Sequence, residues 1–387
     1  KQALGAFHWQ QATDNWTLSS PLLTLNSTAF NTDNTFKLTI PKNDQAIDLS
    51  LRSNFAIHDA TQTPHYLPVG VIDDALVEWL DNAFLAGHAN GGILFHGALN
   101  DYPFTQPKGV FEILFDAHDV TLHYAADWPQ LEALKAEVRF FAESLEVTVH
   151  QGLAKQANIQ QAKVTIDSFT FSDYLNIQGT ANGELAQAIQ FLRHSPFHEE
   201  LNTVTELLDG QGLLDANIDL KIPLADDLIT KINILAVTQN ATLHILPADL
   251  TISGLNAEIQ ITENTIFSQQ INAQTLGFPI QAKLDYSNAN TRVFISGQTD
   301  TQHLAQQFPH PLWAQTDGIS DYQVQLNIPI DNTKSSYIQL SSDLTGIAID
   351  FPPFSKPAAQ VHPLALDMHI KPSGVESFSF NYDNRLA

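Results

Sequence analysis

Apolar and polar residues alternate along most of the chain. Ile218, Leu220 and Ile222 are separated by Asp219 and Lys221, and the same alternation recurs at 145–150, 278–286 and 322–330. Residues two apart on a β-strand share a face, so each segment predicts a strand with one apolar and one polar face. Runs of this kind between Gly, Pro, Asn and Asp predict about 25 strands.

Helical periodicity is rare. Residues 71–84 carry apolar side chains four apart and predict one amphipathic helix. Residues 184–208 predict a helical hairpin that is interrupted at Pro196 and ends near Gly210, a residue type typical of a helix C-terminus. An apolar patch at 304–308 predicts a smaller counterpart.

The chain also repeats itself. Residues 134–166 resemble 255–286, and 212–224 match 318–330 with a shared Ile-Pro ending. Two copies of a long unit are therefore visible, at about 128–224 and 243–330, and 93–104 resembles the end of an earlier one. Such repeats predict stacked units, each in contact with its neighbours.

Strands with one apolar face must cover that face, and three short helices are too few for about 25 strands. The sheet can pack against a second sheet as a sandwich. Alternatively, it can curl into a trough whose dry interior holds an apolar ligand. Alternation alone leaves both solutions open, and the sandwich is the commoner one.

Charge and composition narrow the function classes. The chain has 18 Lys and Arg against 42 Asp and Glu, and no cysteine. A net charge of −24 disfavours nucleic acid and anionic membrane surfaces. The apolar region 67–87 contains four acidic residues, so it does not predict a membrane span. Because the chain begins without Met, we interpret it as part of a longer protein.

The sequence contains no recognisable motif for catalysis or metal binding. The 15 histidines are scattered, and His194 and His198, four apart, are separated by Pro196 and lack a third ligand. Adjacent carboxylates at 199–200 and 226–227 do not identify a catalytic pair. The sequence has no P-loop, GxSxG or GxGxxG motif. We therefore predict a protein that is not an enzyme and has no catalytic residue, metal or cofactor.

Several stretches, in this order, resemble a known family. They are HYLPV (65–69), LVEWL (76–80), GGILFHGALNDYPF (91–104), LHYAADWP (122–129), FLRHSP (191–196), GFP (277–279), SDLTG (342–346) and PPFSKP (352–357). Together they resemble the central region of YhdP-type members of the AsmA-like superfamily of bridge-like lipid transfer proteins. Residues 1–60 show only weak similarity.

The resemblance implies the trough. It implies an elongated, curved antiparallel β-sheet groove, in which phospholipid acyl chains slide between the inner and outer membranes of the bacterial envelope. The expected segments of one continuous groove are 1–127, 128–242 and 243–387. We expect a monomeric, periplasmic part of an inner-membrane-anchored protein, whose membrane contacts lie in other parts of the parent.

On this interpretation the alternating apolar residues line the groove. The predicted lining residues are Val147, Val149, Ile218, Leu220, Ile222, Phe278, Ile280, Leu284, Val324, Leu326 and Ile328. The predicted helix at 71–84 would act as a gate or cap through Leu76, Trp79, Leu80 and Phe84. The alternative is a structural or adhesive β-repeat scaffold that binds glycan or protein. A polysaccharide-acting enzyme is the least favoured hypothesis.

Overall fold

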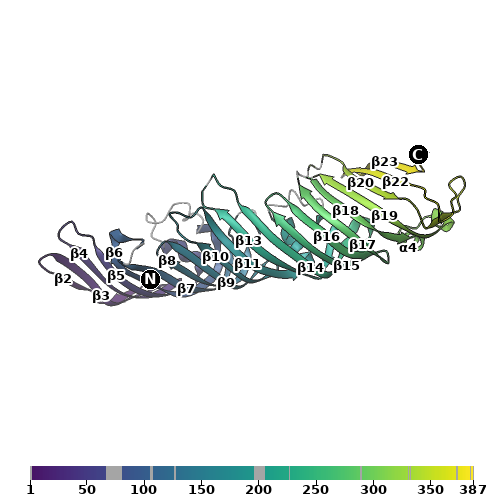
Figure 1. Cartoon of the computed structure of the whole chain (residues 1–387). Helices are drawn as coiled ribbons and strands as arrows, with labels where there is room; N and C mark the ends of the chain where they lie inside the picture. The colour runs from purple at the N-terminus through teal and green to yellow at the C-terminus, as the bar shows by residue number, and fades with distance from the viewer. Residues whose placement is uncertain are drawn as a thin grey trace. The chain divides into compact units, whose positions relative to one another are not determined.

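The computed structural model describes residues 2–386 except 67–80, 105–107, 126–127, 196–204, 226, 288–289, 330, 332, 372–373 and 384 (Figure 1). The described residues include 24 strands, the α-helices α2 and α4, a helical turn at 81–83 and four short 3-10 helices. The paired strands of the described residues run antiparallel. The prediction of a mainly β fold with an antiparallel sheet and few helices is confirmed.

The chain divides into two compact units, residues 1–181 with 218–231, and residues 182–217 with 232–387. In the first unit, β1 and β2 both pair with β3, and from β3 to β10 each strand pairs with the next. The strands are β1 (Gln2–Gly5), β2 (His8–Gln11), β3 (Asn15–Asn26), β4 (Phe30–Pro41), β5 (Asp48–Ile57), β6 (Phe84–Ala98), β7 (Val110–Leu122), β8 (Leu131–Phe141), β9 (Ser144–Ala154) and β10 (Ala157–Ile166). Residues of β11 (Tyr174–Glu184) and β13 (Leu213–Pro223) occur in both units.

The second unit has the same antiparallel order. Consecutive pairs run from β14 to β20, β20 then pairs with β22, β12 pairs with β14, and β21 pairs with the start of β19. The strands are β12 (Leu208–Gln211), β14 (Lys231–Ile245), β15 (Leu250–Thr262), β16 (Ile266–Thr275), β17 (Phe278–Ser287), β18 (Asn290–Asp300), β19 (Thr316–Pro329), β20 (Ser336–Ser342), β21 (Ile347–Ile349), β22 (Leu364–Lys371), β23 (Gly374–Tyr382) and β24 (Arg385–Leu386). The predicted division into 1–127, 128–242 and 243–387, and their joining into one groove, stays a prediction.

The sequence repeat corresponds to a repeated order of elements. Three strands (β8–β10) precede β11 and helix α2 (Leu185–Arg193), and three strands (β15–β17) precede β18 and helix α4 (Thr301–Gln307). The long strands β13 and β19 then follow. Helix α2 confirms the first half of the predicted hairpin, and α4 confirms the smaller helix predicted around 304–308.

Glycines mark the start of the strand that follows each helical segment. Gly87, Gly212 and Gly318 have φ of +132°, +105° and +126°, in the region that favours glycine. At Gly318 a Cβ would lie 2.0 Å from the carbonyl oxygen of Gly346. Register shifts interrupt the pairing of β6 with β7 and of β14 with β15 near two of these glycines. Because β-bulges bend strands and increase their twist, these positions curve the sheet.

Two helix predictions need correction. The predicted helix at 71–84 is helical at 81–83, and 67–80 lies outside the described residues, but Phe84 is the first residue of β6 and lies opposite Leu122. Pairing with a neighbouring strand prevails there over helical spacing.

The predicted second helix of the hairpin is also partly wrong. Leu208 and Gly210, expected at its end, belong to strand β12 and lie opposite Ile245 and Leu243 of β14. Helix propensity is a weak prior that tertiary pairing overrides. Residue 205 is helical and residues 206 and 207 form a turn, whereas the segment 196–204, which carries most of this predicted helix, lies outside the described residues.

Candidate functional site

One face of the sheet in the first unit is apolar from strand to strand. Directly opposed residues of antiparallel strands lie on the same face, so their pairing traces rows across the sheet. Val147 and Val149, both predicted from the sequence, belong to two adjacent rows. The first row contains Phe55, Gly91, Phe115, Val138, Val147 and Val164, and the second contains Ile57, Ala89, Ala117, Ala136, Val149 and Ala162.

The second unit has equivalent rows. One contains Leu284, Val293, Leu326, Ile338, Met368 and Phe378, and the next contains Ala282, Ile295, Val324, Leu340, Leu366 and Phe380. The predicted residues Phe278 and Ile280 share the face of Ala282 and Leu284 on β17, and Ile328 shares that of Leu326 on β19. These rows bring six predicted residues onto one face.

The other three predicted residues lie on β13. Ile218, Leu220 and Ile222 are half-buried, and they alternate along this strand with residues that include exposed Lys221. Their placement on a strand with two-residue periodicity is therefore as predicted.

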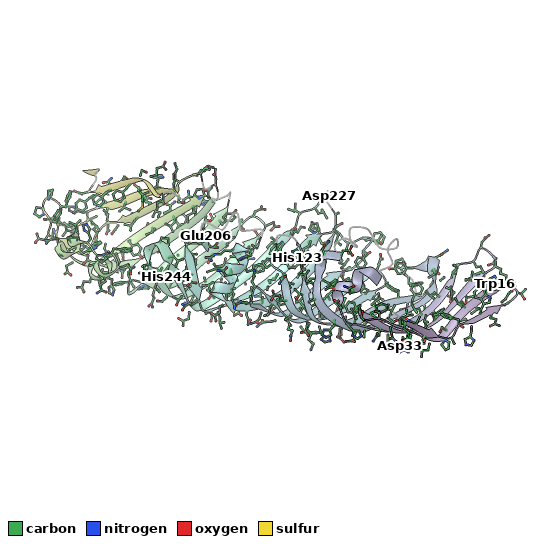
Figure 2. All side chains as sticks on the ribbon, turned by 180° about the vertical axis from the view of Figure 1, so that it is seen from behind. Trp16, Asp33, His123, Glu206, Asp227 and His244 are labelled. Atoms are coloured by element: carbon green, nitrogen blue, oxygen red, sulfur yellow. The ribbon has the colours of Figure 1, made fainter. Side chains whose placement is uncertain are left out.

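The opposite face of the sheet is mostly polar, with a few exposed apolar side chains such as Leu114 and Phe294, and it holds cross-strand ion pairs. Arg139 Nε lies 2.7 Å from Glu112 Oε1, and Lys163 Nζ lies 3.1 Å from Glu146 Oε2. On the N-terminal strands, Trp16 lies opposite Ile40 on the apolar face, whereas Asp33 lies on the opposite face of β4 (both are labelled in Figure 2). Each unit thus has one apolar and one polar face, as the alternation predicts.

Within each unit the large side chains of the apolar face are not covered by a second sheet. Val147, Leu284, Val324 and Leu326 are all half-buried, whereas a sandwich would bury such side chains almost completely. Among the predicted lining residues Ile280 differs, because it is only 6% exposed. The structure therefore favours the open face, which alternation alone could not distinguish from a sandwich.

Loops cover parts of this face, and one of them lies at an edge of the second unit. Leu344, Ile347 and Tyr382 form a buried cluster, against which Phe354 and three other apolar side chains pack. The hydroxyl of Tyr382 donates to the Phe354 carbonyl at 2.9 Å, and Lys356 Nζ donates to two backbone carbonyls of the same loop. This loop covers Tyr382 but leaves Phe378, on the same face of β23, 58% exposed.

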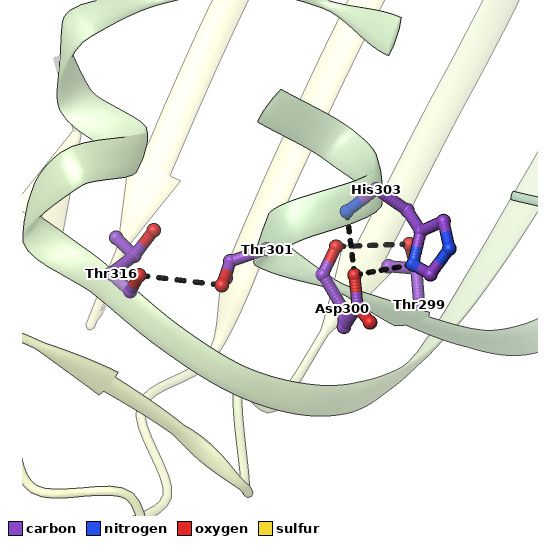
Figure 3. Close-up of polar contacts among 5 residues, drawn as sticks. All are labelled: Thr299, Asp300, Thr301, His303 and Thr316. Carbon is purple, nitrogen blue, oxygen red and sulfur yellow. Dashed lines mark hydrogen bonds and ion pairs between the residues drawn. The ribbon is translucent and has the colours of Figure 1, made fainter. Parts of the chain in front are cut away.

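Helix α4, at the end of β18, begins with a capping interaction (Figure 3). Asp300 Oδ1 accepts a hydrogen bond from the His303 backbone N–H at 2.6 Å and lies 2.8 Å from His303 Nδ1. The Thr301 hydroxyl donates to the Thr316 carbonyl at 3.3 Å. Burial alone would raise the pKa of Asp300, but the hydrogen bonds from His303 outweigh it and lower that pKa.

We predict that the chemical shift of the His303 backbone amide proton follows the protonation of the Asp300 carboxylate. The midpoint of this change should lie below the usual Asp pKa of about 3.9. The pKa of Asp300 is lower in the folded than in the unfolded chain. The ionised carboxylate therefore stabilises the fold fully at pH values above the unfolded pKa, and this stabilisation is lost as the pH falls through the folded pKa. An NMR titration of this amide from pH 7 to 2 measures the midpoint. Asp300→Asn should remove the step, and a midpoint at or above the usual value would contradict the assignment.

The remaining candidates give no further site. Leu76, Trp79 and Leu80, the predicted gate or cap residues, lie outside the described residues, as does His198. In the part of the chain that the structure describes, no group of three or more His, Asp or Glu could hold a metal ion. No helix of that part is long and apolar enough to cross a bilayer.

The whole chain is similar to one known protein family. A family model described as "YhdP protein" matches residues 1–387. A curated relative, the intermembrane phospholipid transporter YhdP of Escherichia coli (strain K12), is 23% identical over 348 residues. The alignment covers 87% of this chain and 27% of the relative, so the chain spans about a quarter of that protein's length. No solved structure matches the chain.

Proposed function

This chain belongs to the YhdP protein family, and from that premise we propose that it carries phospholipids between membranes on its apolar face. The supporting observation is the uncovered apolar face, whose rows cross six strands in each unit, for example from Leu284 on β17 to Phe378 on β23. An apolar face of this extent needs a hydrocarbon partner to remove it from water.

The transport mechanism follows from hydrocarbon solvation. Each methylene of an acyl chain gains about 0.8 kcal/mol when it leaves water for an apolar surface. Neighbouring strands lie about 4.8 Å apart, so a chain that moves by one strand meets a similar set of side chains. Since the energy changes little from step to step, the barrier to sliding is low. The headgroup stays in water at the open side.

We propose that the predicted lining residues contact the acyl chains, and that the protein performs no covalent chemistry. They are Val147, Val149, Ile218, Leu220, Ile222, Phe278, Ile280, Leu284, Val324, Leu326 and Ile328. We further propose a periplasmic location, within a longer membrane-anchored protein whose other parts contact the two membranes. The name of the curated relative, an intermembrane phospholipid transporter, supports both proposals. The scaffold alternative predicted a closed sandwich core, which the uncovered face disfavours.

The proposal predicts that the chain, purified in mild detergent from a bacterial envelope fraction, retains phospholipid. We expect organic extraction and mass spectrometry to find at least about one phospholipid per chain, because an apolar surface of this size binds hydrocarbon strongly. A β-sandwich protein of similar size, purified in parallel, controls for carry-over. Equal lipid in both samples would contradict the proposal.

A further inference from the structure

A short loop after β6 folds back onto the apolar face of the first unit. It contains a 3-10 turn (Leu99–Asp101) and Phe104, which is 8% exposed. The ring of Phe104 lies over Gly97 and Gly109, where an added Cβ would come within 2.9 Å and 2.4 Å of its Cε1 atom. Gly97 lies opposite Leu49 and two residues from Phe95, so it is on the same face of β6 as Phe95. The loop therefore rests on the apolar face.

Four aromatic rings meet at this point. Phe95 and Phe111 are directly opposed on β6 and β7, with ring centroids 6.1 Å apart. Tyr102 contacts Phe111 edge to face at 5.5 Å and stacks over Phe95 at 6.5 Å. Phe104 is buried, but Tyr102 is 49% exposed. An aromatic side chain therefore reaches from the apolar face into water at its edge.

Three charged residues lie at this edge: Asp101 and Lys108 form an ion pair, with Nζ 3.6 Å from Oδ1, and Glu143 adds a further negative charge. The turn between β8 and β9 lies beside the cluster, because the Ala142 N–H donates to the Phe111 carbonyl at 2.9 Å. Glu143, the next residue, belongs to this turn. Burial and then the negative charge of Glu143 raise the pKa of Tyr102. The basic side chains of Arg139 and Lys163 lie on the polar face, where they pair with carboxylates.

A second aromatic residue on the apolar face already contacts a cation. Trp16, which lies opposite Ile40, has the Lys42 ammonium 5.0 Å from its ring centroid. A cation this close to the face of an aromatic ring is attracted by the ring quadrupole. Ammonium recognition by an aromatic side chain at the end of a strand is thus present elsewhere in the same unit.

We propose that Tyr102 and Glu143 form a subsite for the ammonium group of a zwitterionic phospholipid, such as one with an ethanolamine headgroup. This inference rests on the proposed function, because it requires acyl chains on the apolar face beside Phe95 and Phe111. The Tyr102 ring attracts the ammonium, and the Glu143 carboxylate neutralises it. An anionic headgroup gains neither contact and is repelled by Glu143 and by the net charge of −24.

The subsite is tested with the whole chain, delipidated and then equilibrated with equimolar phosphatidylethanolamine and phosphatidylglycerol of identical acyl chains. Native mass spectrometry measures the ratio of the two bound lipids. For the wild type we expect a preference for phosphatidylethanolamine of about two- to fivefold, the usual range for an exposed cation–π contact. Tyr102→Ala and Glu143→Gln should each bring the ratio close to one without changing the total lipid bound.

Two controls isolate the subsite. Tyr102→Phe retains the ring face and should retain the preference. Glu137→Gln makes the same charge change on the polar face, where Glu137 lies opposite Asp116 and Thr148, and should leave the ratio unaltered. Retained preference in both Tyr102→Ala and Glu143→Gln, or an equal loss in Glu137→Gln, would overturn the subsite.

The same experiment separates this inference from the function on which it rests. Absence of both lipids from the wild type would refute the proposed lipid binding as a whole, whereas equal binding of both would refute the subsite alone. A further sample contains millimolar glycerophosphoethanolamine, which has the headgroup but no acyl chains. We expect no displacement of lipid, and displacement would assign the subsite to soluble amines instead.

Discussion

Leu326→Asp is expected to reduce the lipid bound to the second unit by at least about tenfold, because it places a charge in the middle of an apolar row. Leu326 lies between Val293 and Ile338 on neighbouring strands and is half-buried. An acyl chain that crosses this row would have to displace water from the carboxylate. The cost of desolvating an unpaired charge is several kcal/mol, more than a few methylene contacts can offset.

The matched control is Gln325→Asp, one residue away on the same strand. Gln325 lies opposite Phe294 and Gln339 on the other face, so the variant adds the same charge without touching the apolar row. The amount of a phospholipid with a fluorescent acyl chain that each variant binds is measured, and circular dichroism verifies that both variants are folded. Equal binding by Leu326→Asp and the wild type would show that lipid does not lie on this face.

The sequence alone predicted which residues share a face, because the two-residue period of a strand is a local property. Shifting a strand by one residue would move every side chain to the wrong face, so the alternation in 322–330 already determines the side that Val324 and Leu326 occupy. The same argument correctly predicted the placement of Val147 and Val149. Their contact with lipid stays a prediction.

Other features depend on neighbours that are distant in sequence, and these were missed or misassigned. Phe84 continued a helical spacing, yet pairing with Leu122, 38 positions along the numbered chain, makes it a strand residue. The aromatic cluster requires the loop that carries Tyr102 to fold back over β6, and its sequence contains no periodic signal. Whether the apolar face is covered is likewise a property of the whole unit.

The glycines with positive φ could be predicted from the sequence only in part. The repeat aligned Gly212 with Gly318, which was a usable signal for a shared backbone conformation. Gly87 was not aligned with them, although the structure places it equivalently, after a helical segment and at positive φ. The bulges near these glycines are invisible to a pattern search, because they are defined by a change of register between two strands.

Gly318→Ala should have the largest effect on stability, lowering the local free energy of unfolding at the start of β19 by about 2–4 kcal/mol. Its φ of +126° is unfavourable for any residue with a Cβ, and that atom would lie 2.0 Å from the Gly346 carbonyl oxygen. The backbone of β21 would have to move, which breaks the pairing of Gly318 with Ile347.

Hydrogen exchange measured by mass spectrometry over β19 and β21 tests this effect. A loss of 2 kcal/mol corresponds to exchange that is about 30-fold faster. Gly374→Ala is the matched control, since Gly374 has the same φ of +126° but a Cβ there would meet nothing within 4 Å. The difference between the two variants therefore isolates the clash with β21 from backbone strain. If both variants lost equal protection in their own strands, close approach of β19 and β21 would not be the reason that position 318 requires glycine.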